Sequence, residues 1–310
     1  SPNPFIDVYA WTHYALEALG RGQNPYEIWM PNIYHHTLWF DPKLADNDWV
    51  KTGYAYPPLS LLVSGLGYLA GDMRWANLGL MLLTGACLFS IHGRFALLAG
   101  ALYLTTPRIL FVLEQSWTDT YVVGLIAATV WSACRLPSAT PYLFGLTVVS
   151  KQYTLFVVPL ALLLIPRPWS MRATIIWTIK AITSGLAVTG PFLLWNARAM
   201  LDSLMITGHP FRPESLSFLA ATAKNGQPTF PLYIQFALLI PAYALIAWRA
   251  PKTPAGFALS AGLVYSVFFS FSKHAFCNHH FLVLGCACIA LAATDSSSRA
   301  KNNSGEVVSV

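Results

Sequence analysis

Charged residues are scarce in this chain. Only 10% of the 310 residues are Asp, Glu, Lys or Arg, whereas 55% are hydrophobic; soluble domains ordinarily carry about 25% charged residues. A chain with so little charge forms neither a soluble surface nor a disordered linker. The composition therefore excludes secreted, fibrous and nucleic-acid-binding proteins and predicts an integral, polytopic membrane protein.

Paired cysteines, basic runs and metal motifs are also missing. The five cysteines form no Cys-x-x-Cys pair, which excludes a disulfide framework, and the 19 Lys and Arg are scattered singly. Residues His274, Cys277, His279 and His280 are metal-ligand types. Consecutive side chains on a helix point about 100° apart, so at most two of the four would converge. We expect no metal, no cofactor and no nucleic-acid partner.

The first 72 residues are predicted to lie outside the membrane. Residues 1–55 are the least apolar part of the chain, and residues 6–20 show roughly helical spacing of apolar side chains, as in an amphipathic surface helix. The stretch 56–70 would rise only about 22 Å as a helix, so we interpret it as re-entrant or interfacial. The chain opens with Ser1-Pro2 and no signal peptide, which leads us to expect a missing upstream segment.

Residues 73–293 are predicted to form an all-α membrane domain of about nine crossings, interrupted by an external loop at 196–230. The apolar segments are 74–92, 95–112, 118–135, 138–150, 153–166, 172–195, 231–249, 255–272 and 275–293. Residues 294–310 are polar and are predicted to be a disordered cytoplasmic tail.

Basic residues in short loops set the orientation, because such loops stay in the cytoplasm. Arg94, Arg135, Arg167 and Arg249 fall on one face if 56–70 does not cross and 138–166 makes two short crossings. All acidic residues except Asp295 and Glu306 then lie on the external face.

Polar residues gather on that external face. The turn from Glu114 to Asp119 carries two carboxylates, and Ser150-Lys151-Gln152 interrupts an apolar run. A Lys at such a depth needs an anionic partner, for which Glu114 is a candidate. A further cluster runs from Lys273 to His280, where helical spacing would put Lys273, Cys277 and His280 on one side.

The long external loop holds His209, Arg212 and Glu214 within a short Pro-rich stretch, which could grip an anion or simply be polar because it is solvated.

Taken together, these segments resemble the glycosyltransferase C superfamily, and within it the bacterial polyprenyl-phosphate-mannose-dependent mannosyltransferase-like membrane proteins. The matching pieces stand in the family's order and span nearly the whole chain. They are Ile6-Asp7-Val8-Tyr9, Gly22-Gln23-Asn24-Pro25-Tyr26, Tyr56-Pro57-Pro58-Leu59, Glu114 to Asp119, Ser150-Lys151-Gln152-Tyr153 and Lys273 to His280. In such proteins a transmembrane helix precedes the aspartate-bearing loop, so the first one is expected to be missing here. His274, His279 and His280 depart from the family's usual C-terminal cluster.

The resemblance implies inverting transfer of a mannose-like hexose from a polyprenyl-phosphate donor to a lipid or glycan acceptor. The active site would face the outside of a bacterial inner membrane. Asp7 would be the catalytic base, and Lys273, Lys151, Arg212 and His274 would hold the donor phosphate. Sugar or acceptor binding would fall to Glu114, Asp119, Gln152, His209, Asn278 and Tyr56, with the two carboxylates alternatively orienting the basic residues.

A secondary transporter is the alternative from another class, with Lys151, Glu114 and Lys273 along a substrate path. Transporters commonly contain inverted repeats with interrupted helices. The sequence shows no such repeat, and its polar groups lie on one face.

Overall fold

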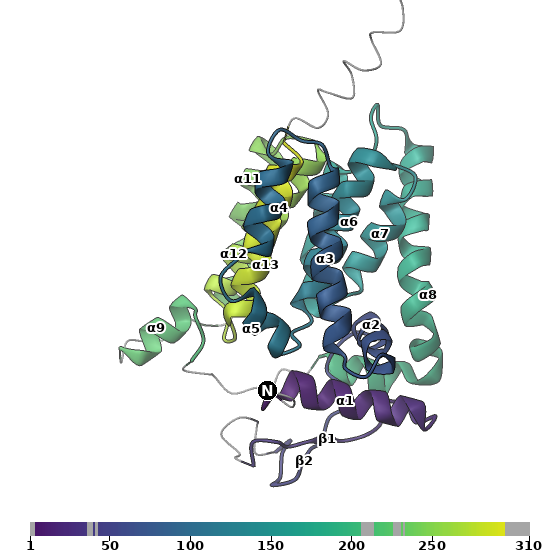
Figure 1. Ribbon diagram of the computed structural model, residues 1–310, viewed down its shortest axis with the longest axis vertical. Coiled ribbons are helices and arrows are strands. Elements are labelled where there is room, and N and C mark those ends of the chain that lie inside the picture. The colour runs from purple at the N-terminus through teal and green to yellow at the C-terminus, as the bar shows by residue number, and fades with distance from the viewer. Residues whose placement is uncertain are drawn as a thin grey trace, which may run out of the picture.

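A computed structural model describes residues 4–35, 40, 43–205, 214–225, 231 and 233–294 of the chain. The expected tail at 295–310 lies outside these residues. A bundle of helices stands upright, and a helix with a small hairpin lies across one end of it (Figure 1). The described part is helical, as expected for an all-α membrane fold, apart from one two-stranded sheet.

The N-terminal region forms the layer at the end of the bundle. Helix α1 (Asp7–Gly20) buries its apolar face, and strands β1 (Met30–Pro31) and β2 (Trp49–Val50) pair antiparallel. The indole of Trp11 donates a hydrogen bond to the Pro31 carbonyl at 2.9 Å and so ties α1 to β1. Helix α2 (Pro58–Leu69) begins at a proline, whose missing N–H costs nothing in a first turn.

Twelve further helical elements follow in the described chain. They are α3 (Arg74–Ser90), α4 (Ala96–Leu104), α5 (Ile109–Glu114), α6 (Asp119–Arg135), α7 (Thr140–Val148), η2 (Gln152–Leu163), α8 (Met171–Leu204), α9 (Phe218–Lys224), α10 (Tyr233–Ala237), α11 (Leu239–Arg249), α12 (Pro254–Ser270) and α13 (Cys277–Ala292). Helix α6 packs against α3, α7, α12 and α13 and is buried on most of its surface, so it forms the centre of the bundle.

The segment predicted as one helix at 95–112 is divided into α4 and α5. Pro107 disfavours a helical backbone at Thr106, and Arg108 adopts a left-handed conformation with φ 69°. The short helix α5 then leads into the polar turn before α6 (Figure 1).

The segment predicted as a short crossing at 153–166 is a long 3₁₀-helix, η2, rather than an α-helix. A 3₁₀-helix rises about 2.0 Å per residue, against 1.5 Å for an α-helix. Pro159 lies inside it and has no N–H to donate, and the Phe156 carbonyl accepts a hydrogen bond of 2.6 Å from the Tyr243 hydroxyl. The twelve residues of η2 therefore span a greater length of the bundle than they would as an α-helix.

The predicted external loop at 196–230 is partly helical. Helix α8 continues past its expected end to Leu204, with a kink at Asn196, where φ is −161° and ψ is 94°. Helix α9 also falls within the predicted loop. The kink lets the last turns of α8 run along the N-terminal layer instead of continuing in the direction of the bundle.

One helix among the described residues, Met171–Leu204, is both long and apolar enough to cross a membrane by length and composition. The other apolar helices contain 10–17 residues. The nine crossings and the domain limits at 72 and 294 therefore stay predictions.

The helical arrangement predicted from Lys273 to His280 is wrong for its first half. Residues 272–276 are not helical, and α13 begins only at Cys277. The Ala275 N–H donates to the Ser215 hydroxyl at 2.8 Å, and the Ala275 carbonyl accepts from the Leu216 N–H at 2.5 Å. These tertiary bonds replace the helical ones and bring residue 214 beside the start of α13.

Candidate active site

A cavity of about 660 Å³, here called the main cavity, opens where the N-terminal layer meets the bundle. Seven separate stretches of the chain contribute to it, most of them close to the ends of helices. The lining residues are Phe5, Ile6, Asp7, Val8, Tyr34, Tyr56, Trp117, Lys151, Tyr153, Glu214, His274, Phe276, Asn278 and His279.

Asp7 lies half-buried at the first position of α1, with Ile6 as the N-cap residue. Its Oδ1 accepts the Val8 N–H at 2.9 Å, and its own N–H donates to the Tyr34 hydroxyl at 3.2 Å. The positive end of the helix dipole stabilises a carboxylate at this position. The carboxylate therefore has a structural contact and also faces the main cavity.

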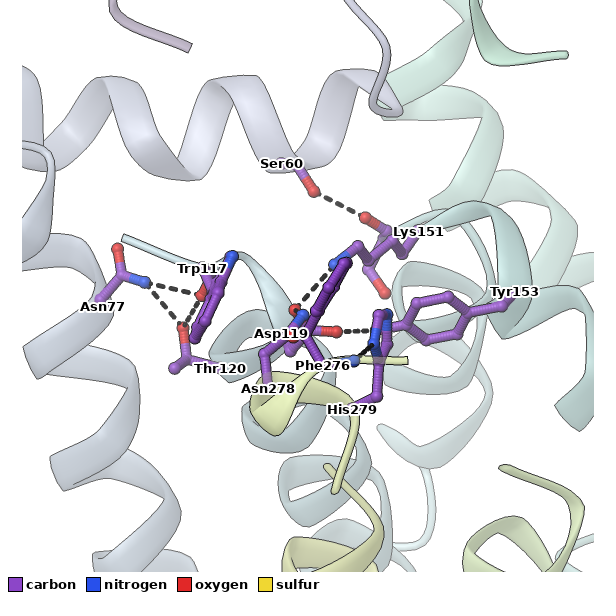
Figure 2. Close-up of polar contacts among 11 residues, drawn as sticks. Ser60, Asn77, Trp117, Asp119, Thr120, Lys151, Tyr153, Phe276, Asn278 and His279 are labelled. Carbon is purple, nitrogen blue, oxygen red and sulfur yellow. Dashed lines mark hydrogen bonds and ion pairs between the residues drawn. The ribbon is translucent and has the colours of Figure 1, made fainter. Parts of the chain in front are cut away.

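Lys151 and Asp119 form a buried ion pair beneath the main cavity (Figure 2). Lys151 is 7% exposed and Asp119 is fully buried, and Lys151 Nζ lies 2.8 Å from Asp119 Oδ2. The same oxygen accepts from Asn278 Nδ2 at 2.5 Å, and Oδ1 accepts from the Tyr153 hydroxyl. Because its oxygens are engaged within the protein, Asp119 is placed to orient Lys151 rather than to hold a sugar.

Lys151 also lies between two aromatic rings. Its Nζ is 5.5 Å from the ring centre of Tyr56 and 5.3 Å from that of Tyr153. Aromatic faces stabilise a cation that has lost water. The ammonium group is thereby fixed at the wall of the cavity.

A second network fixes the turn before α6. Asn77 Nδ2 donates to the Trp117 carbonyl at 2.9 Å and to Thr120 Oγ1 at 3.0 Å (Figure 2). Asn77 Oδ1 accepts from the Tyr121 hydroxyl at 3.0 Å and from Ser116 Oγ at 3.3 Å. This buried amide holds the Trp117 ring against the cavity and sets the position of the first residue of α6.

The start of α13 brings two more polar groups to the site. His279 Nδ1 accepts the Phe276 N–H at 3.0 Å, which leaves its Nε2 to carry the proton when the ring is neutral. Asn278 is buried, and its Oδ1 accepts no hydrogen bond from the part of the chain that the structure describes. Asn278 thus offers an acceptor atom beside Asp119.

Tyr56 and Asp7 also line a smaller cavity of about 180 Å³, here called the small cavity, together with Trp11, Ala55, Gln152, Ser203 and Leu204. Gln152 donates from Nε2 to the Ala55 carbonyl. Burial, and then the neighbouring Asp7 carboxylate, raise the pKa of Tyr56 well above its ordinary value. Its phenol is therefore neutral and able to donate a hydrogen bond.

The structure gathers some of the sequence-predicted residues and separates others. Asp7, Tyr56, Lys151, His274 and Asn278 line the main cavity. Their roles in catalysis or binding stay predictions.

Three other candidates take different places. Gln152 lines the small cavity and Asp119 is buried behind Lys151, whereas Lys273 is not among the residues that line either cavity. Arg212 and His209 lie outside the described residues.

The candidate pairing of Lys151 with Glu114 is wrong. Asp119 is the partner, and Glu114 lines a hollow of about 360 Å³ between α3 and α5, together with Arg74 and Asp72. The turn that separates the two carboxylates directs them to opposite sides, which the spacing alone did not reveal.

Sequence reasoning also missed aromatic residues of the main cavity, including Tyr34, Trp117, Tyr153, Phe276 and His279. Tyr153 and His279 stand in motifs that the sequence had singled out, directly beside predicted residues. Tyr34 had no such signal, because only the fold of the first loop brings it to Asp7.

No group of three or more His, Cys, Asp or Glu side chains within the described residues is arranged to hold a metal ion.

No family model matches the chain, and no curated protein sequence matches it. Solved structures do. ArnT from Cupriavidus metallidurans bound to undecaprenyl phosphate matches with a TM-score of 0.58 and 16% identity over 93% of this chain and 55% of ArnT. Its apo structure matches with a TM-score of 0.56 and 16% identity over 93% and 54%. The chain shares the ArnT fold.

ArnT is a glycosyltransferase C enzyme that uses a polyprenyl-phosphate sugar. The fold expected from the sequence resemblance is thereby confirmed. The chain spans about half the length of ArnT.

Proposed function

We propose that this protein is a membrane glycosyltransferase that moves a sugar from a polyprenyl-phosphate donor to an acceptor hydroxyl. The observation that carries the proposal is the main cavity, where a carboxylate at a helix N-terminus faces a buried, oriented lysine. The undecaprenyl phosphate bound to ArnT supports the same class of donor. A transporter would require polar groups along the depth of the bundle, whereas this cavity lies at one end.

The chemistry needs one base and one cation. The acceptor oxygen attacks the anomeric carbon, the bond from that carbon to the phosphate oxygen breaks, and polyprenyl phosphate leaves with the bonding electrons. Asp7 takes the proton of the acceptor hydroxyl, as a general base within reach of the nucleophile can. Attack from the face opposite the phosphate inverts the anomeric configuration.

Lys151 is the residue best placed to meet the leaving phosphate. It is the one Lys or Arg among the described residues that line the main cavity. A fixed positive charge in a site poor in water stabilises the charge that develops on a leaving group. Asp119 and Tyr153 hold it in position, and His274 lies on the same wall. Lys273 and Arg212 would add positive charge for the same phosphate.

Sugar and acceptor hydroxyls would meet Asn278 Oδ1, the Tyr56 phenol and Gln152. The rings of Trp117 and Phe276 would cover the apolar face of the sugar. We further propose that the sugar is a mannose-like hexose, that the acceptor is a lipid or a glycan, and that the site faces the outside of a bacterial inner membrane.

The test is transfer from a defined donor. The protein as the cell produces it is placed in membranes with polyprenyl-phospho-mannose that is radiolabelled in the sugar. We expect label to pass to envelope lipid or glycan with inverted configuration, and polyprenyl phosphate to be released. If mannose, glucose and galactose donors all stay intact, the proposed function is wrong.

A further inference from the structure

A polar groove lies beside the N-terminal layer, away from the main cavity. Its volume is about 600 Å³, and it runs between the first external loop and the last turns of α8. We call it the Trp29 groove. Its lining includes Glu27, Trp29, Lys43, Lys51, Asp202 and Ser203.

The side chains of this groove suit an uncharged, hydroxyl-rich ligand. Glu27 and Asp202 carry negative charge, and Lys43 and Lys51 carry positive charge, so the charges of the described lining balance. Such a surface offers both donors and acceptors without attracting a polyanion.

An exposed aromatic ring stands among these charges. Trp29 is 53% exposed, and Lys51 Nζ lies 5.8 Å from its ring centre. A sugar ring has one face of C–H groups, which packs on an aromatic face, and a rim of hydroxyls, which carboxylates and ammonium groups bind. Trp supplies a large, rigid contact of this kind at low entropic cost.

The groove is a neighbour of the small cavity that Asp7 lines. Ser203 lines both the Trp29 groove and the small cavity, and Asp7 and Tyr56 line both the small cavity and the main cavity. Ser203 Oγ donates to the Ala199 carbonyl at 2.8 Å and therefore keeps a fixed position. A Cβ on Gly53 would lie 2.5 Å from Ser203 Oγ and 2.3 Å from the Tyr26 carbonyl oxygen, so only glycine permits this approach.

We propose that the Trp29 groove binds a neutral carbohydrate chain of the acceptor, whose reacting hydroxyl reaches Asp7 through the small cavity; this rests on the proposed function. Strands β1 and β2 lie beyond α1, at the end of the molecule far from α4 and α11 (Figure 1). A groove in that position is better suited to a ligand that extends away from the membrane than to a lipid headgroup that stays within it.

The experiment measures binding directly and needs no turnover. The protein in lipid nanodiscs is titrated with mannohexaose, maltohexaose and cellohexaose, and ligand-observed saturation-transfer NMR reports binding. At least one neutral hexasaccharide should bind, and Trp29→Ala should weaken it at least tenfold. Trp29→Phe should retain most of the binding because a flat ring remains.

Trp49→Ala is the matched control. Trp49 is on the neighbouring strand, is also exposed, packs against Tyr14 and does not line the groove. The Trp49→Ala variant should bind the hexasaccharide as tightly as the unchanged protein does. Thermal unfolding of each variant checks that the fold is intact, and Lys51→Ala gives a second, smaller perturbation of the same site.

Two results would overturn the proposal. The first is that no hexasaccharide binds, and the second is that heparin or anionic lipid vesicles bind to the groove while neutral sugars do not. Asp7→Asn should keep the binding, since the groove does not include Asp7. If the unchanged protein transfers sugar from no donor but still binds the hexasaccharide through Trp29, the proposed function is wrong and the groove is a carbohydrate site with another role.

Discussion

Replacing Asp7 by Asn separates its chemical role from its structural one. The carboxylate accepts the Val8 N–H at 2.9 Å at the start of α1, and the amide oxygen of Asn can accept the same bond. What the fold loses is a negative charge at a helix N-terminus, which is worth about 0.3–1 kcal/mol. The variant should therefore fold and insert normally.

The chemical loss should be much larger. General-base catalysis contributes about 10²–10⁴-fold, and each tenfold corresponds to about 1.4 kcal/mol of activation free energy. Asp7→Asn should reduce sugar transfer at least hundredfold while donor binding is retained. Transfer is measured with radiolabelled polyprenyl-phospho-mannose, and stability is measured by thermal unfolding of the same preparation.

Glu17→Gln is the matched control for this change. It makes the same carboxylate-to-amide replacement on α1, where Glu17 has only exposed contacts with His13 and Arg21 in the described structure. It should leave transfer unchanged. Near-native transfer by the Asp7→Asn variant would refute the base assignment and leave Asp7 as a helix-end residue.

Three further tests address the surrounding structure. Lys151→Met should cost about 3–5 kcal/mol of stability by leaving the buried Asp119 without its cation, and adding Asp119→Asn should recover the thermal stability but not donor binding; recovery of both would remove Lys151 from the site. Asn278→Asp places a second carboxylate at the 2.5 Å contact with Asp119, so its melting temperature should rise as the pH falls and the pair shares a proton; a flat profile would contradict the contact. Gly145→Ala should destabilise by about 1–3 kcal/mol or more, because a Cβ there would lie 2.0 Å from the carbonyl oxygen of Ala181. Gly190→Ala is the control: a Cβ at that position of α8 has nothing within 4 Å, so it should not lower stability in the same unfolding assay.

The sequence predicted the helical membrane fold because that follows from composition and the length of apolar segments. It also identified Asp7, Lys151 and Asn278, since polar groups beside apolar runs are expensive and therefore informative. These three line one cavity in the structure.

The remainder depended on tertiary contacts that no local pattern encodes. Lys151 pairs with Asp119 at the start of α6, and the turn before this helix is held by hydrogen bonds from the buried amide of Asn77. The non-helical backbone at Ala275 is held by hydrogen bonds to Ser215, which is 60 residues away in the sequence. Local helical spacing predicted the wrong conformation there because such bonds override propensity.

A density map of the protein with undecaprenyl phosphate bound tests the central claim most directly. We expect the phosphate in the main cavity, within about 3 Å of Lys151 Nζ, with Asp7 facing the space beside it. Phosphate density in the hollow beside Arg74 and Glu114 instead, with the main cavity unchanged, would contradict the account.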